Sequence, residues 1–496
     1  MNASTKKILL AVVVLLAVAA LGGYFVFIPK QEKKYEQAIA AFIEALPGNL
    51  SADTITVNAL GNSAEIRGLR GATHYFGHDV NVDVASLTLT GLNFTPGKGV
   101  GKLVDSLIIS GISITEAANP VQPQDVTQDI ALKSLELHNV RGDFNAAAEL
   151  LGDVPLARKM DIAATFSAGP IRLQDYVITT HTIQGPIVLS LASSEAQEAS
   201  LLTGKNAVSQ NLRLIAFDTD IISLDRISTA SVKLPNILAP LVEFVKMEAL
   251  DTTSVLILEK IRQEPVEMRG VVMEGFRFQF MTPEPITISK LRMDLDAAAG
   301  RLAFKKEVQG LNLPPALYGP LSLEATQFSA FYAKPLDLDL RMDVALAHKS
   351  GAPVAITIND LFIRDKNLAS AQLKAELLHN GDAQHVYAVF GSTPDSLSLK
   401  NAVLTLVDKA LIATFLEAEF GGEAADMREQ MAQIIVALSA VMGEGFVLIV
   451  EGLAKLIQVP GALTITSTPE MPVNLADPLN AIVKALRLTV EHTPSN

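Results

Sequence analysis

The feature that most constrains the fold is a period-two alternation of apolar and polar residues that recurs after residue 50. It appears in five runs within the first 140 residues: 54–57, 64–69, 86–92, 106–112 and 134–140. In most of them a Gly or Asn precedes one more apolar residue, as in Gly68-Leu69 and Gly111-Ile112. Such alternation is typical of half-buried antiparallel strands, and the Gly or Asn fits a bulge or turn that curves the sheet. We therefore expect an α+β fold that consists mainly of curved antiparallel sheet.

The order of the predicted elements suggests an internal duplication. Residues 31–46 show the periodicity of an amphipathic helix, and residues 236–250 can place apolar side chains on one helical face in the same way. The runs that follow match in order: 55–57 with 255–257, 64–69 with 266–271, 86–89 with 286–289 in opposite phase, and 159–162 with 341–344. Chance explains any single match, but the ordered set favours two tandem units, each with one helix and a curved sheet.

The last part of the chain changes character. Residues 407–420, 424–442 and 446–457 read as helices, with a last strand at 463–466 and a short helix at 481–486. The segment 446–457 is too short to span a membrane, so it is a buried helix or one that faces a partner. In 424–442 an apolar stripe is expected from Met427, Met431, Ile434, Ile435, Leu438 and Met442. The expected organisation is a stub and anchor at 1–30, one unit at 31–235, a second at 236–402 and a C-terminal helical region at 403–496.

A run without charged residues covers residues 8–28. As a helix it would be roughly 31 Å long, close to the hydrocarbon thickness of a bilayer. A cleaved signal peptide is the alternative, with Lys6 and Lys7 as its basic start and 17–19 as its cleavage site. The run continues well beyond residue 19, which favours a retained transmembrane anchor. Lysines flank both ends, so charge does not settle the orientation. We expect the N-terminus in the cytoplasm and the large domain exported, because the segment also has the character of an export signal.

Charge and composition narrow the function classes. The net charge is −13, and no basic cluster follows the anchor, which excludes nucleic acid as a partner and a broad electrostatic hold on anionic lipid. The chain is 49% hydrophobic but only 5% aromatic, with no Trp and no Cys. An aliphatic interior is therefore expected, and a lipoprotein anchor is excluded.

The layout resembles the YdgA-like family of inner-membrane-anchored envelope proteins. The resemblance rests on the anchor at 8–28, the strand-to-helix passage at 396–409 and the following helix at 427–442. The short strands that end in Gly-Leu are similar to AsmA-like envelope proteins, which are implicated in lipid transport. A doubled helix-plus-sheet unit is similar in outline to tubular lipid-binding proteins. These resemblances imply a protein of the bacterial inner membrane with the bulk of its chain in the periplasm, and they supply no catalytic residue.

The histidines and glycines do not form a convincing reactive site. His74 and His78, close to Asp79 and Asp83, are interpreted as a solvated hairpin, although such groups can bind a metal. His379, Asp382 and His385 flank the expected Asn380-Gly381 hairpin turn between 371–378 and 384–390. The Gly-rich segment 96–101 lacks the spacing of a phosphate-binding loop and is expected to be a turn.

Other catalytic arrangements are also missing from the sequence. No Gly-x-Ser-x-Gly elbow occurs, and the carboxylate pairs Glu419 with Glu423 and Asp337 with Asp339 are interpreted as solvated. We assign no catalytic residue, no metal ligand and no cofactor, and we do not expect an enzyme. The leading hypothesis is a membrane-tethered protein that binds or guides an apolar ligand, expected to be lipid. The alternative is a non-catalytic envelope scaffold that binds another protein.

Overall fold

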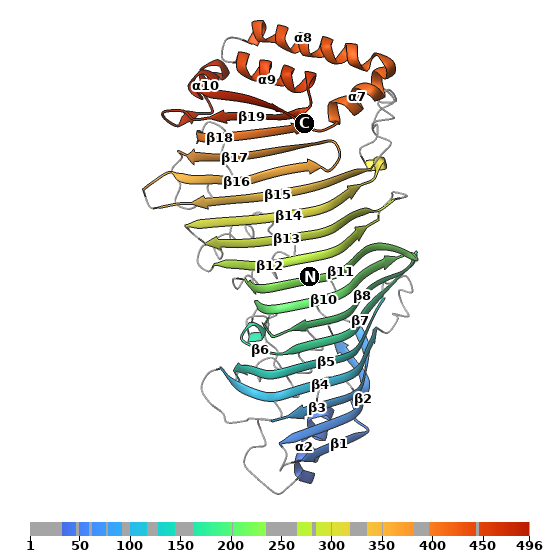
Figure 1. Ribbon diagram of the computed structural model, residues 1–496. Coiled ribbons are helices and arrows are strands. Elements are labelled where there is room, and N and C mark those ends of the chain that lie inside the picture. Colours follow the sequence, from blue (N-terminus) through green and yellow to red (C-terminus); the bar gives the residue numbers. More distant parts are fainter. Residues whose placement is uncertain are drawn as a thin grey trace. The chain divides into compact units, whose positions relative to one another are not determined.

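The computed structural model describes residues 32–45, 49–58, 62–75, 78–91, 100–116, 127–143, 158, 162–200, 202–234, 265–279, 284–298, 300–317, 335–349, 351–380, 396–442 and 446–495. The expected anchor at 8–28, the expected helix at 236–250 and the run 255–257 lie outside these residues. The chain divides into two compact units, Met1–Val271 and Val272–Asn496. Antiparallel strands dominate both units (Figure 1).

The first unit is an antiparallel sheet that begins beside one helix. Its strands pair in the order β1-β2-β3-β4-β5-β7-β8-β10-β11. The elements are α2 (Glu32–Ala45), β1 (Thr54–Asn58), β2 (Ser63–Tyr75), β3 (His78–Thr90), β4 (Val100–Glu116), β5 (Thr127–Asp143), β6 (Ser167–Ala168), β7 (Ile171–Thr182), β8 (Gly185–Ala196), β9 (Glu198–Ser200), β10 (Thr203–Ala216) and β11 (Thr219–Lys233). The division between the units falls in β12 (Val266–Phe278).

A line of backbone kinks crosses this first sheet. Gly68 in β2, Gly111 in β4, Asp175 in β7 and Asn211 in β10 have φ angles of 60°, 62°, 48° and 53°. The strand registers place both glycines opposite Ala85 of the intervening strand β3. Gly, Asn and Asp are the residues that adopt such angles most readily. Every second strand of this part of the sheet therefore bends along one line, which we call the crease.

The crease changes which positions of a strand face the core. In β3 the buried positions before it are even-numbered (Val82 and Val84), and those after it are odd-numbered (Leu87 and Leu89). Without a kink, an uninterrupted period of two would turn one of these pairs toward solvent. Because the phase inverts at the crease, one face of the sheet stays apolar along the whole strand. The expected role of Gly68 and Gly111 in bending the sheet agrees with this geometry.

Helix α2 covers the apolar face at the first edge of this sheet. Ile43 is 2% exposed and joins a core that contains Ile66, Leu87 and Ile109, each 1% exposed. The amide of Val57 in β1 donates a hydrogen bond of 3.4 Å to the Glu36 side chain on the helix. The predicted amphipathic helix at 31–46 is thus confirmed.

The second unit repeats the antiparallel pattern and ends in helices. Its strands pair in the order β13-β14-β15-β16-β17-β18-β19-β21, and β20 also pairs with β18. The strands are β13 (Ile286–Ala298), β14 (Arg301–Leu313), β15 (Leu336–Ala347), β16 (Val354–Asp365), β17 (Ala369–His379), β18 (Leu397–Asp408), β19 (Gly461–Ser467), β20 (Val473–Asn474) and β21 (Leu488–Pro494). The helices are η2 (Pro315–Leu317), α7 (Leu411–Phe420), η6 (Gly421–Glu423), α8 (Ala424–Met442), α9 (Val447–Gln458) and α10 (Leu479–Ala485).

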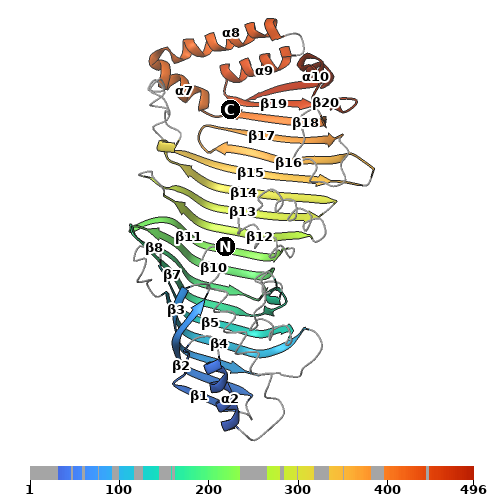
Figure 2. The same cartoon turned by 180° about the vertical axis from the view of Figure 1, so that it is seen from behind.

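Helix α9 lies beside β19 and β21, and α8 lies beyond α9 (Figure 2). The side chains of Val450, Ala454 and Ile457 on α9 are buried, so the alternative of a buried helix at 446–457 is confirmed. Gly452 allows the close approach, because a Cβ atom there would lie 2.5 Å from the Cγ1 atom of Val490. The apolar face of the sheet is therefore covered at its β19–β21 edge.

The structure corrects three details of the sequence reading. Residues 341–344 lie in β15, whereas Ile162 lies in a helical turn, so the expected match is wrong at Ile162; residues 159–161 lie outside the described part of the chain. The predicted stripe on α8 is also wrong in part: Met431 and Ile435 pack inward, but Ile434 and Leu438 are 60% and 46% exposed, because the neighbouring helices cover only one side of α8.

The third correction concerns the region 403–496, which contains β19, β20 and β21 besides its helices; of these, the sequence predicted only the strand at 463–466. The expected domain boundary between residues 402 and 403 falls inside β18. The expected domain boundary between residues 235 and 236 lies outside the described part of the chain.

Candidate functional site

Large apolar side chains on one face of the second sheet are partly exposed over β15 and β16. On β15 the even-numbered side chains are apolar and the odd-numbered ones from Asp337 to Asp343 are charged, as a period of two requires. On this face Met342, Leu361 and Ile363 are 37%, 44% and 47% exposed. Large apolar side chains that gather in one exposed place are characteristic of binding surfaces.

These side chains line a hollow of about 510 Å³, a volume within the usual range for small-molecule pockets. Its floor consists of two rows that cross the strands at right angles. The registers give one row as Lys306, Met342, Leu361, Leu373 and Leu404, and the other as Val308, Leu340, Ile363, Ala371 and Leu406. Neighbouring strands lie about 4.8 Å apart, so each row runs roughly 19 Å from β14 to β18. The hollow is thus a trough across the sheet rather than a deep cavity.

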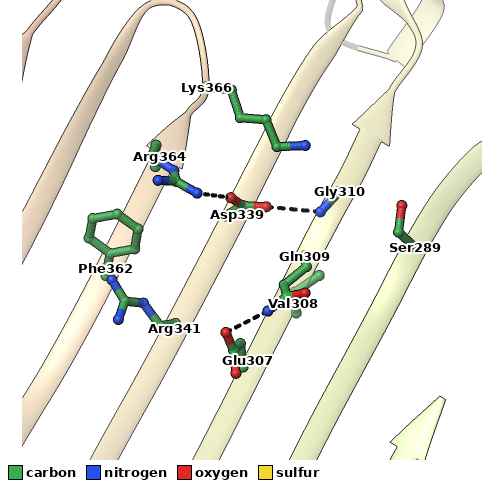
Figure 3. A pocket seen from close by; sticks show the side chains of 10 residues that line it. All are labelled: Ser289, Glu307, Val308, Gln309, Gly310, Asp339, Arg341, Phe362, Arg364 and Lys366. Carbon is green, nitrogen blue, oxygen red and sulfur yellow. Dashed lines mark hydrogen bonds and ion pairs between the residues drawn. The ribbon is translucent and has the colours of Figure 1, made fainter. Parts of the chain in front are cut away.

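The opposite face of the same strands carries a polar pocket of about 450 Å³ (Figure 3). Asp339, 7% exposed, lies at its centre. Its carboxylate accepts a hydrogen bond of 2.9 Å from the amide of Gly310 and forms an ion pair with Arg364. Lys366 donates to both carboxylate oxygens of Asp337, each at 2.9 Å. Figure 3 shows the Asp339 and Arg364 side chains pointing toward one another.

The charges of this pocket satisfy one another. Burial alone would raise the pKa of Asp339, but the hydrogen bonds from Arg364 and Gly310 and the nearby positive charges hold it below its ordinary value. Arg341 stacks over the Phe362 ring, 4.3 Å from its centroid, and lies 3.5 Å from the carboxylate of Asp360. An ionised, fully engaged Asp339 is a poor proton acceptor. The contacts of Asp339 with Gly310 and Arg364 therefore hold β14, β15 and β16 together.

The carboxylate pairs from the sequence differ from what was expected. Asp339 was expected to be solvated, but the positive φ of Gly310 directs its amide at this carboxylate, and the backbone bulge between Val308 and Leu311 encloses it. Glu423 is exposed, as expected, whereas Glu419 is half-buried with Oε1 away from solvent. The solvated interpretation is therefore wrong for Asp339 and for Glu419.

The histidine and glycine candidates are not brought into one site. His74 and His78 lie at the end of the β2–β3 hairpin, where β2 and β3 pair up to Tyr75 and His78, so the expected hairpin is confirmed. His379 is buried at the end of β17, and Asp382 and His385 lie outside the described residues. Of the segment 96–101, Val100 and Gly101 begin β4, and the rest is not described. No cluster of three or more metal-ligating side chains occurs in the described parts of the chain.

The trough and Lys306, the cation on its face of the sheet, were not predicted from the sequence. A usable signal was present, because the alternation in 302–308 places Lys306 in the same phase as Phe304 and Val308. Among the residues that the structure describes, no helix is long and apolar enough to cross a bilayer. Comparison of the sequence with protein-family models gives no match, and comparison with curated proteins gives no significant similarity. The resemblance to envelope families stays an expectation.

Proposed function

We propose that this protein is a membrane-tethered, exported protein of the bacterial envelope that binds the aliphatic part of a lipid in the trough of β14–β18. The observation that carries the proposal is the partial exposure of Met342, Leu361 and Ile363 on one face. Burial of apolar surface is worth about 25 cal/mol per Å². A flexible apolar chain laid along the two rows would remove much of this surface from water.

The chemistry of the trough suits a lipid better than a reacting substrate. Apart from Lys306, the lining side chains on this face are aliphatic; Arg341, Phe362 and Gln372 also border the hollow, but they belong to the row on the opposite face of the sheet. Such a surface recognises length and apolarity rather than a pattern of hydrogen-bond donors and acceptors. We infer a binding or guiding role in which the lipid is unchanged. The proposed inner-membrane anchor at 8–28 would keep the trough within reach of a bilayer.

A photoreactive amino acid at position 361 tests the proposal in living cells. The full chain carries benzoylphenylalanine in place of Leu361, and the cells are fed radiolabelled acetate, which enters every lipid. Lys374, exposed on the opposite face of β17, gives the matched control position. We expect light-dependent transfer of label to the protein from position 361 and little from position 374. Equal labelling of the two positions, or no labelling at 361, would reject the lipid-binding proposal.

A second candidate function, binding of another protein, has its own support. Ile434 and Leu438 on α8 are one helical turn apart and are 60% and 46% exposed. Such an uncovered apolar strip is suited to a partner surface. The same photoreactive residue at position 434 would then yield a crosslinked protein of defined mass. If position 434 captures a defined protein and position 361 captures no lipid, the scaffold function replaces the first proposal.

A further inference from the structure

Lys306 is a charged residue among apolar neighbours on one face of the second sheet. Its neighbours across the strands are Met293 on β13 and Met342 on β15, and its neighbours along β14 on the same face are Phe304 and Val308. Among the described side chains that β13–β18 direct to this face, Lys306 is the one Lys or Arg; the carboxylates Asp365 and Asp408 share its face, but they lie at the last positions of β16 and β18. Lys306 is exposed, and it makes no hydrogen bond or ion pair within the described part of the chain.

The next residue shows that this arrangement is particular to Lys306. Lys305 lies on the opposite face of β14, where its ammonium group is 3.0 Å from the carboxylate of Asp343. Several other charges on that face are paired in the same way, as with Arg364 and Asp339 or Lys366 and Asp337. Lys306 instead lies at the β14 end of the hollow, in the row that continues through Met342 and Leu361 to Leu404 on β18; Met293, its neighbour on β13, does not line the hollow.

From this placement we infer that the trough takes a lipid with an anionic head group, held at Lys306, whose chain lies across β15–β18. This inference rests on the proposed lipid-binding function and adds the class of head group and the direction of the chain. An ammonium group attracts a carboxylate or phosphate, and the attraction becomes stronger once a bound chain covers the neighbouring apolar side chains and displaces water. The row of roughly 19 Å beyond Lys306 is comparable with the length of a long acyl chain.

The test uses the full chain in lipid nanodiscs and two photoreactive probes of equal chain length. One probe is a fatty acid with a diazirine in its chain, and the other is the corresponding fatty alcohol, which is neutral. Lys306→Met keeps the aliphatic stem and removes the charge. Lys305→Met is the matched control, since it removes a neighbouring charge from the opposite face. Crosslinked peptides that contain Met342 or Leu361 are quantified by mass spectrometry.

We expect the fatty acid to label these peptides about five- to tenfold less in Lys306→Met than in the wild type or in Lys305→Met. The alcohol should label all three proteins equally. If the fatty acid labels Lys306→Met as strongly as the wild type, the role of Lys306 is wrong while the lipid-binding function stands. If neither probe labels the trough in any protein, the proposed function itself fails. A phosphatidylglycerol probe that competes with the fatty acid would identify a phosphate head as an equivalent source of the anion.

Discussion

Replacing Gly111 by Ala probes the crease most directly. Gly111 has a φ angle of 62°, and a Cβ atom there would lie 2.7 Å from the Cβ of Ala85 on the neighbouring strand. An L-residue in this left-handed conformation costs about 1–2 kcal/mol. Overpacking against a neighbour that cannot move away costs about 1–3 kcal/mol. The smaller number of conformations in the unfolded chain offsets about 0.4–1 kcal/mol.

The net expectation is a loss of about 2–4 kcal/mol in the free energy of unfolding of the first unit. For a unit of this size such a loss lowers the melting temperature by about 5–12 °C. Differential scanning calorimetry of the full chain in detergent measures it. Gly101→Ala, in the same strand, is the matched control, because no atom lies within 4 Å of its Cβ position; its change should stay within about 0.5 kcal/mol.

A third variant separates the two causes. Asn tolerates a positive φ angle, as Asn139 and Asn211 do in this sheet, but its Cβ atom meets Ala85 in the same way. Gly111→Asn should therefore recover about 1 kcal/mol relative to Gly111→Ala and remain less stable than the wild type. If Gly111→Ala is as stable as Gly101→Ala, the crease does not depend on left-handed backbone at this position, and the reasoning is refuted.

Three further changes test other parts of the structure. Asp339→Asn leaves Arg364 without its carboxylate and should lower the free energy of unfolding by about 1–3 kcal/mol above about pH 4. Because the pKa of Asp339 is lowered in the folded state, the difference from the wild type should shrink as the pH falls through that pKa, and urea unfolding between pH 3 and 7 would show this. Burial raises the pKa of Tyr176 to about 12, so between pH 10 and 12 the folded state keeps the phenol proton that the unfolded state loses. The stability of the wild type should therefore fall more steeply over this range than that of Tyr176→Phe, and parallel pH profiles would contradict the raised pKa. Gly452→Ala should lose about 1–3 kcal/mol in urea unfolding, because the added methyl group would meet β21, whereas Gly422→Ala, with no atom within 4 Å, should change little.

Much of the sheet could be predicted from residue types alone. Alternation in 86–92 and 106–112 predicts strands, and Gly68 and Gly111 stand where the backbone bends. The strands are longer than the runs suggested, since the phase inversion at the crease makes one strand read as two short pieces. Helices 424–442 and 446–457 were predictable from their length and periodicity.

The trough was not predictable in the same way, because exposure depends on what covers a face. Val308, on the floor of the trough, is 4% exposed, whereas Leu361 in a similar apolar run is 44% exposed. Nothing local separates these two residues; only the positions of neighbouring strands and helices do. Asp339 shows the same limit, because the amide that binds it belongs to Gly310, on another strand.

The crease also bears on how such a chain tolerates insertions and deletions. A residue lost from an uninterrupted strand turns every later side chain to the wrong side. In β4 the backbone at Gly111 already separates two stretches whose side-chain order is set independently. In an unbent strand a residue lost before position 111 would also turn Ile112 and Ile114, whereas the bend at Gly111 allows those two side chains to keep their places. Damage on one arm of the sheet therefore need not reach the other.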